Sequence, residues 1–260
     1  MSATADPPPA APRPAAFRSA LARPLDFSYP SNRVAAAGSV GAALLALAFG
    51  RPWAQAAGVG GAAFLAWATA RELDPDHPVT ANAALPVAAA AALLGGAGNP
   101  LAGLAALSGL RLIAGTTGEA ATRTDHAGML VQALLAGASG ERAAAFLAGG
   151  ASLLTAEARS ALPAAGALTP TLRQQAGLSW GSALLAASVL PLAGILTAPE
   201  AVTSVCDRAG RAVRAQEVQL ARHAAVLTLG AGLLSRRTGG LVPLAAALLT
   251  VAARRAGSGS

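Results

Sequence analysis

Apolar residues along this chain fall into a series of nearly uncharged runs, and the polar residues are confined to the short segments between them. A straight helix needs about 20 residues, and at least about 17, to cross the hydrocarbon core of a bilayer. Four or five runs reach this length and the others are shorter. The pattern predicts an all-α fold, a polytopic integral membrane helical bundle of about seven transmembrane helices within a range of about six to nine. The runs cover residues 34–50, 54–70, 79–97, 101–115, 128–138, 143–154, 177–198, 218–235 and 241–253.

The N-terminal region differs from the rest of the chain. Its opening stretch is rich in Pro and Ala, cannot bury a core, and is predicted to be disordered. Residues 17–25 are predicted to form a short amphipathic helix at the membrane surface, and we expect no signal-peptide cleavage before Val34 because no apolar core of that kind precedes it. The expected organisation is a disordered or interfacial tail at 1–33, a transmembrane domain at 34–255 and a flexible tail at 256–260.

Composition supports a membrane protein. Charged residues make up 12% of the chain and the mean hydropathy is +0.51, whereas a typical soluble domain has about 25% charged residues. The alternative is a soluble, alanine-rich helical protein, because alanine forms helices well but drives membrane insertion only weakly. The repeated apolar runs, with so little charge between them, favour the membrane interpretation.

The basic residues are all arginine, and they stand singly or in pairs at the ends of apolar runs. That placement is typical of membrane anchors rather than of a nucleic-acid-binding stripe. The expected partners are the lipid bilayer and, through faces rich in small residues, a second copy or a membrane-complex subunit, with no nucleic acid. The single cysteine, Cys206, excludes an intramolecular disulfide. Arginines before the first run predict a cytoplasmic N-terminus in a bacterial inner (plasma) membrane: Arg13, Arg18, Arg23 and Arg33.

The orientation of the second half depends on residues 128–154. If they cross the membrane twice, Arg208, Arg211 and Arg214 lie outside; if they cross once or are re-entrant, these arginines lie inside. The positive-inside tendency favours the second interpretation. Residues 200–217 are predicted to form a surface helix between two spans.

Charge is concentrated in two segments, "RELDPDHP" at 71–78 and "TTGEAATRTDHA" at 116–127. Aligning Asp76-His77 with Asp125-His126 suggests an internal repeat of apolar run, glutamate, Asp-His and apolar run. Such repeats are common in transporter folds. Two predicted crossings separate the two segments, so both are expected on the same face of the membrane, where they would form a polar site.

These side chains divide by the chemistry that they support. Carboxylates and imidazoles are ligands for divalent metals, and arginines bind anionic groups bidentately. The alternative is structural, because "DPDHP" is favourable turn chemistry and Pro78 suits the first position of a helix. The candidate metal ligands are Asp74, Asp76, His77, Asp125 and His126, and the candidate ligand-binding residues are Arg71, Glu72, Arg111, Glu119 and Arg123.

The segment "GASG" at 137–140 resembles the Gly-x-Ser-Gly around the serine of rhomboid-type intramembrane proteases. The resemblance would make Ser139 a nucleophile and His223 its partner. It covers four small residues and one histidine, and the early histidine-rich span and its asparagine have no counterpart. Glu141 and Arg142 follow at once, where that family continues with an apolar helix, so a turn between short helices is the better interpretation.

Three functions remain open, and neither a catalytic residue nor a substrate is identified. The first is a small transporter-like or ligand-binding membrane protein whose site lies between the two charged segments. The second is a membrane-embedded enzyme that uses a divalent metal on a lipid-linked or phosphorylated substrate. The third is a structural or assembly subunit of a membrane complex.

Overall fold

The computed structural model describes residues 18–155, 159–172 and 179–258, and these residues are predominantly helical. In this part of the chain the only strand-type pairing is an isolated bridge between Val205 and Ala212. The predicted all-α fold is therefore confirmed. The helices are α1 (Pro30–Ala48), α2 (Trp53–Leu73), α3 (Pro78–Gly95), α4 (Pro100–Ala114), α5 (Arg123–Ala138), α6 (Arg142–Leu154), α7 (Leu162–Ala167), α8 (Trp180–Val189), α9 (Ala193–Thr197), α10 (Ala215–Leu234) and α11 (Val242–Ser258), with short 3₁₀ turns at η1 (Leu190–Leu192) and η2 (Gly239–Leu241).

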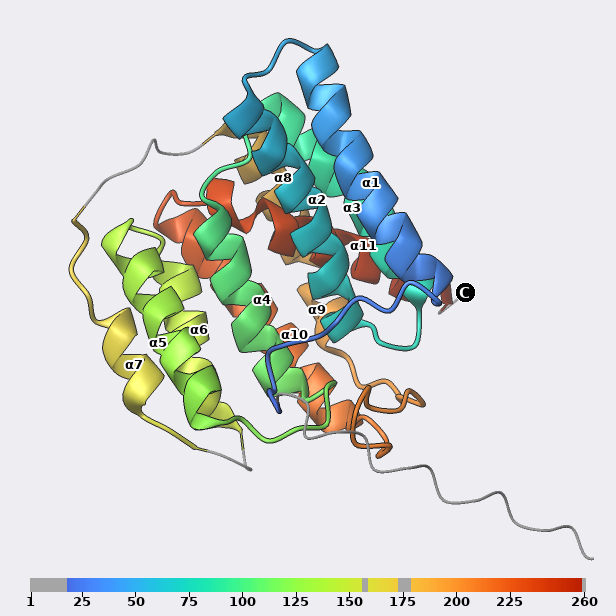
Figure 1. Cartoon of the computed structure of the whole chain (residues 1–260), viewed down its shortest axis with the longest axis vertical. Coiled ribbons are helices and arrows are strands. Elements are labelled where there is room, and N and C mark those ends of the chain that lie inside the picture. Colours follow the sequence, from blue (N-terminus) through green and yellow to red (C-terminus); the bar gives the residue numbers. More distant parts are fainter. Residues whose placement is uncertain (1–17, 156–158, 173–178, 259–260) are drawn as a thin grey trace, which may run out of the picture.

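The helices run back and forth between two ends of one bundle (Figure 1). We call one the basic end; it holds residues 18–29, 74–77, 115–122 and 198–214, and hydrogen bonds join these segments to one another. The opposite, distal end holds the connections at 49–52, 96–99, 139–141 and 235–238.

The first and last described segments both lie at the basic end. Arg23 forms an ion pair with Glu72, and Arg254 forms one with Asp74. Since Glu72 and Asp74 are two residues apart, the chain leaves and returns to the same end of the bundle. This requires an even number of end-to-end passes through the described bundle.

Four segments are long and apolar enough to cross a membrane: Pro30–Ala48, Pro78–Gly95, Trp180–Thr197 and Gly239–Gly257. The third combines α8, η1 and α9, because Pro191 interrupts the regular helix without stopping its course. The described structure thus supports a membrane protein, with fewer clear spans than the sequence pattern predicted. Helices α4 and α6 are apolar but have only 15 and 13 residues.

Small residues let the helices pack closely at the centre of the bundle. A side-chain carbon added at Gly60 of α2 would lie 2.6 Å from the carbonyl oxygen of Ser39 in α1, and one at Gly109 of α4 would lie 2.9 Å from that of Leu147 in α6. Such close backbone approach is typical of membrane helix pairs. The outer faces carry large exposed apolar side chains, for example Leu94 (83% exposed) and Leu227 (72% exposed).

Two predicted helices are not found. Residues 18–25, in the predicted interfacial helix, form an irregular segment at the basic end; Phe17 and the rest of the proline-rich tail lie outside the described residues. Residues 200–214 of the predicted surface helix form a turn closed by the 205–212 bridge, in which Gly210 has a φ of +63°. At the other terminus α11 continues to Ser258, into the predicted flexible tail.

The segment 123–172 differs from both alternatives for residues 128–154, because a third helix, α7, follows the paired helices α5 and α6. Helices α5 and α6 form an antiparallel hairpin, and α7 packs on both and returns the chain toward the distal end, where the amide of Leu172 donates to the carbonyl of Ala138. The net result is one passage from the basic to the distal end. Arg208 consequently lies at the same end as the N-terminal segment, and its guanidinium donates to the carbonyl of Ala22 at 3.0 Å.

Candidate functional site

A buried carboxylate, Glu72 in the last turn of α2, organises one half of the basic end. Its side chain is fully buried and accepts hydrogen bonds from Arg111 of α4 at 2.7 Å, from Arg23 at 3.2 Å and from the hydroxyl of Thr116. Arg23 also forms an ion pair with Asp207. A buried carboxylate is tolerated only when it is paired and hydrogen-bonded, and here it has both.

The N-terminal segment 18–25, which we call the strap, lies across the ends of α2 and α4 (dark blue in Figure 1). Its backbone carbonyls accept from Arg111 at Leu21 (2.6 Å) and from Thr117 at Ala20 (3.2 Å). Its amide at Ala20 donates to Asp125 at 3.0 Å. The strap therefore closes the Glu72 cluster from outside.

A second cluster surrounds Asp74, which is 2% exposed. Arg254 of α11 binds both carboxylate oxygens of Asp74, at 2.8 and 3.0 Å, and His77 contacts it at 3.0 Å. Glu200 bridges the cluster, since it is paired with Arg254, Arg255 and, at 2.8 Å, Arg222. These contacts tie α10 and α11 to the loop after α2.

Glu200 shows how strongly the arginines act. Burial alone would raise the pKa of its carboxyl, but hydrogen bonds from Arg254 and the positive charge of Arg222 lower that pKa to about 2. Asp76 has a different role, because it accepts from the backbone amides of Thr203 and Ser204, each at 2.8 Å. Burial is again outweighed, and these hydrogen bonds lower the pKa of Asp76.

The second Asp-His pair is held apart from the first. Asp125 lies in the first turn of α5, forms a capping box with Thr122, and also accepts from the hydroxyl of Ser19 in the strap. His77, by contrast, precedes α3 as its N-cap residue. The two pairs thus occupy different positions relative to their helices, although both lie at the basic end.

The structure does not gather the predicted metal ligands. Among the described residues, which include all five candidates, no group of three or more His, Cys, Asp or Glu side chains is close enough to hold a metal ion. The physical reason is that arginines occupy Asp74, the 203–204 backbone occupies Asp76 and the strap occupies Asp125.

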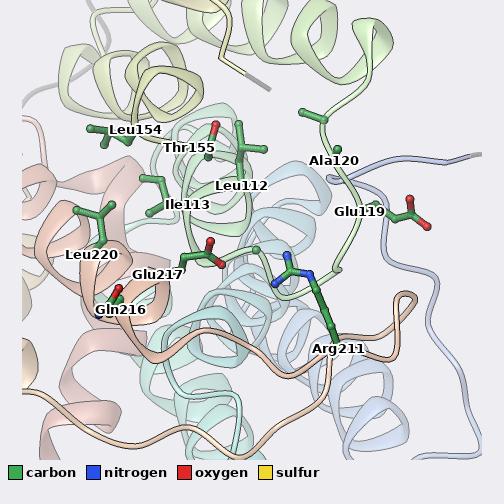
Figure 2. Close-up of a pocket in the computed structure, with 12 residues that line it drawn as sticks. Leu112, Ile113, Glu119, Ala120, Leu154, Thr155, Arg211, Gln216, Glu217 and Leu220 are labelled. Carbon is green, nitrogen blue, oxygen red and sulfur yellow. The ribbon is translucent and has the colours of Figure 1, made fainter. Parts of the chain in front are cut away.

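A pocket of about 240 Å³ lies beside these clusters, between the end of α4, the end of α6 and the start of α10. Figure 2 shows Glu217 at its centre, between Arg211 on one side and a group of apolar side chains on the other. Ala120, in one of the two charged segments predicted from the sequence, lines the rim. The apolar group consists of Leu112, Ile113, Leu154 and Leu220.

Two charged groups of opposite sign face this pocket with unused hydrogen-bonding capacity. Arg214 binds Oε1 of Glu217 at 2.8 Å, which leaves Oε2 buried and without a hydrogen-bond partner in the described structure. In the same part of the chain Nη1 of Arg211 is also buried and unpartnered. A side-chain carbon at Gly115 would lie 2.7 Å from Oε2 of Glu217 and 3.6 Å from Nη2 of Arg211, so the missing side chain, at a φ of +60°, keeps this space open.

The structure does not bring the predicted ligand-binding residues together in one site. Glu119 lines the pocket, but its carboxylate points away from the Arg211–Glu217 pair (Figure 2). Glu72 and Arg111 are paired with each other, and Arg71 stacks on the Trp67 ring at 5.0 Å and donates to Asn32. Arg123 is exposed.

Several residues of the basic end were not singled out by the sequence reasoning. Glu200, Arg222 and Arg254 come from segments more than 120 residues beyond Asp74 and carry no local motif. Arg211 belongs to the three arginines at intervals of three near residue 211, which was the one available signal. The sequence pattern instead predicted that Arg211 belongs to a surface helix.

The protease-like pair is not assembled. The hydroxyl of Ser139, at the distal end, donates to the carbonyl of Ala136 and accepts from Asn99 at 2.8 Å. The ring of His223, on α10, is hydrogen-bonded to the carbonyl of Gln219 at 2.9 Å. In "GASG", Gly137 and Ala138 therefore end α5, and Ser139 and Gly140 lie in the turn before α6.

Comparison with known proteins adds no assignment: no protein-family model, no curated protein and no solved structure matches this chain.

Proposed function

We propose that this chain is a multi-pass membrane protein of transporter-like or ligand-binding type, whose ligand occupies the pocket between α4, α6 and α10. In addition to the four long apolar segments, α2 and α10 have 21 and 20 residues, enough to cross a bilayer. With α4 and one net passage through α5–α7, this gives about eight crossings, an even number.

The distribution of arginines supports an orientation with the basic end in the cytoplasm. Positive residues near span ends are retained on the cytoplasmic side. The distal end carries few arginines in the described structure, and the strap, the start of α5, the 198–214 segment and the end of α11 carry most of the others. Those at the distal end are Arg51, Arg142, Arg236 and Arg237.

One observation supports the binding proposal. The pocket is lined by a hydrogen-bond donor on Arg211 and an acceptor on Glu217, and neither atom has a hydrogen-bond partner in the described structure. A buried unpaired group costs about 1–3 kcal/mol, so proteins keep such groups mainly where a ligand or water completes them. The rest of the basic end pairs its buried charges closely, which makes the pocket the exception. Convergent polar groups in an apolar pocket are typical of ligand sites.

The test is a thermal-shift measurement on the purified protein in detergent, with a panel of amino acids, organic acids, amines, sugar phosphates and free nucleotides. The comparison variant is Ala120→Trp, which fills the pocket from an exposed rim position; Ser28→Trp, exposed at the same end, is the control. We expect at least one compound to stabilise the wild type and the control but not Ala120→Trp. No stabilising compound, or equal stabilisation of all three proteins, would refute the proposal.

A further inference from the structure

The two unpartnered groups in the pocket would be satisfied by a ligand that both accepts and donates a hydrogen bond. Nη1 of Arg211 needs an acceptor, and an anionic one gives the stronger, charge-assisted bond. Oε2 of Glu217 needs a donor. A ligand with an anion alone would place negative charge beside that carboxylate oxygen, and a ligand with an amine alone would leave Arg211 unpaired.

The two groups lie close enough for one small molecule to reach both. Oε2 of Glu217 and Nη2 of Arg211, which belongs to the same guanidinium as the unpartnered Nη1, lie 2.7 and 3.6 Å from one point, the position that a side-chain carbon at Gly115 would take. Arg211 has no ion-pair partner in the described structure, whereas Glu217 shares its other oxygen with Arg214. A ligand with adjacent negative and positive groups would give both side chains a hydrogen-bond partner and would leave the net charge of the pocket nearly unchanged.

The apolar side of the pocket indicates the chemistry of the rest of the ligand. Beyond Glu217, on the side away from Arg211, the pocket is lined by leucine and isoleucine side chains (Figure 2). Its volume of about 240 Å³ is below the roughly 300–1,000 Å³ of pockets for drug-sized ligands. The occupant is therefore a small metabolite with a short aliphatic part.

Resting on the proposed function, we propose that the pocket binds an aliphatic α-amino acid of the size of valine, leucine or isoleucine. Arg211 receives the carboxylate and Glu217 the ammonium group. Leu112, Ile113, Leu154 and Leu220 contact the side chain. The same pairing of anion and ammonium occurs in a phosphoethanolamine headgroup, but the apolar wall beside Glu217 and the small volume favour the amino acid.

The experiment measures equilibrium binding of radiolabelled leucine to the full-length protein in detergent, with unlabelled competitors. 4-Methylpentanoate lacks the ammonium group and isopentylamine lacks the carboxylate, so each should compete at least about tenfold less well than leucine, the factor that corresponds to one lost charged hydrogen bond. Glycine should also compete poorly, because it cannot contact the apolar wall.

Two variants separate the roles of the charged groups. Arg211→Gln should weaken leucine binding about tenfold or more, and Glu217→Gln should remove the preference for leucine over 4-methylpentanoate. Arg33→Gln and Asp26→Asn, at exposed positions near the basic end and outside the pocket, are the matched controls and should bind leucine as the wild type does. Unfolding temperatures establish that each variant is folded.

The outcomes distinguish this inference from the proposed function. Stabilisation by phosphoethanolamine or a sugar phosphate that Ala120→Trp abolishes, without leucine binding, would overturn the amino-acid class and leave the pocket a ligand site. Leucine binding that Arg211→Gln and Glu217→Gln do not change would overturn the assigned roles. If no compound is sensitive to Ala120→Trp, the pocket is not a ligand site and both proposals fail.

Discussion

Asp74 and Asp76 form an Asp-x-Asp in the sequence, and the folded chain gives the two carboxylates different environments. Asp74 is 2% exposed and is held by Arg254 and His77. Asp76 is only half-buried and organises the backbone at 203–204. The difference comes from partners more than 120 residues away, which a local motif does not identify.

The two aspartates therefore make a matched test of stability. Asp74→Asn keeps the shape but leaves Arg254 and Arg222 with one carboxylate fewer, and breaking a buried ion pair costs about 3–5 kcal/mol. Asp76→Asn loses hydrogen bonds in a solvent-accessible loop, worth about 1 kcal/mol each. We expect Asp74→Asn to lower the free energy of unfolding, measured by denaturant titration in mixed micelles, clearly more than Asp76→Asn. Equal losses would contradict the buried cluster.

Glu141 at the distal end predicts a pH dependence. It is 7% exposed, and burial raises the pKa of its carboxyl from 4.5 to about 7 despite the nearby charge of Arg237. Because the folded state holds this proton more tightly than the unfolded state, the stabilisation is complete below pH 4.5 and is lost as the pH rises toward 7.

The full shift of about 2.5 pKa units corresponds to about 3.5 kcal/mol at about 1.4 kcal/mol per unit. About 2–3 kcal/mol of this is lost between pH 4.5 and 7, because titration is only half complete at each of these two limits. Glu141→Gln, which cannot ionise, should flatten the dependence of unfolding free energy on pH between 4.5 and 7. An unchanged slope in this variant would show that another group titrates there.

At the scale of the element, the strap is the clearest departure from the predicted pattern. A helix over 17–25 would satisfy its own backbone groups, but here the carbonyls of Ala20, Leu21 and Ala22 accept from Thr117, Arg111 and Arg208. These contacts stabilise an irregular conformation that local propensity does not favour. The strap is thus part of the folded basic end.

Truncation tests the strap. Deletion of residues 1–25 removes Arg23 and the carbonyl of Leu21, which accepts from Arg111. Glu72 then loses one of its two cationic partners, and the deletion should destabilise the protein by about 3 kcal/mol. Deletion of residues 1–17 leaves these contacts in place and should have little effect. Unfolding temperatures of the two truncated proteins in the same detergent measure the difference, and indistinguishable values would show that the strap contributes no stability.

At the scale of the whole molecule, the charged clusters occupy one end and exposed apolar side chains cover the helix faces between the ends. Arrangement of the helices in alternating directions brings the loops after α2 and α4 and the segment after α9 together. On the positive-inside tendency, we propose that the basic end faces the cytoplasm. This orientation can be tested without knowing the ligand.

Single cysteines test it directly. In a Cys206→Ala background, Arg51→Cys at the distal end should react with a membrane-impermeant maleimide in intact cells. Arg123→Cys at the basic end should react only after the membrane is permeabilised. Both positions are exposed, so a difference in reactivity reports the side of the membrane. The reverse pattern would invert the orientation, and labelling of both in intact cells would contradict a membrane-spanning bundle.

The sequence by itself determined the helical class, most helix positions and the concentration of charge in two segments. These depend on local properties: apolar runs favour helices in lipid, and Pro78 and Pro100 mark helix starts. Even the shared location of the two Asp-His segments follows from counting crossings, because two helices separate them. Counting crossings does not predict which charged side chains pair with each other.

Tertiary structure alone decided which charges pair and which remain free. Glu72 is paired with Arg111 and Arg23, Asp74 with Arg254, and the pocket is formed by Arg211 and Glu217, across sequence separations of 39 to 180 residues for the pairs. Such contacts depend on helix packing and on close approach at glycines, which no short window of sequence specifies. The predicted metal ligands were therefore distributed among structural contacts, and the unused donor and acceptor appeared beside them.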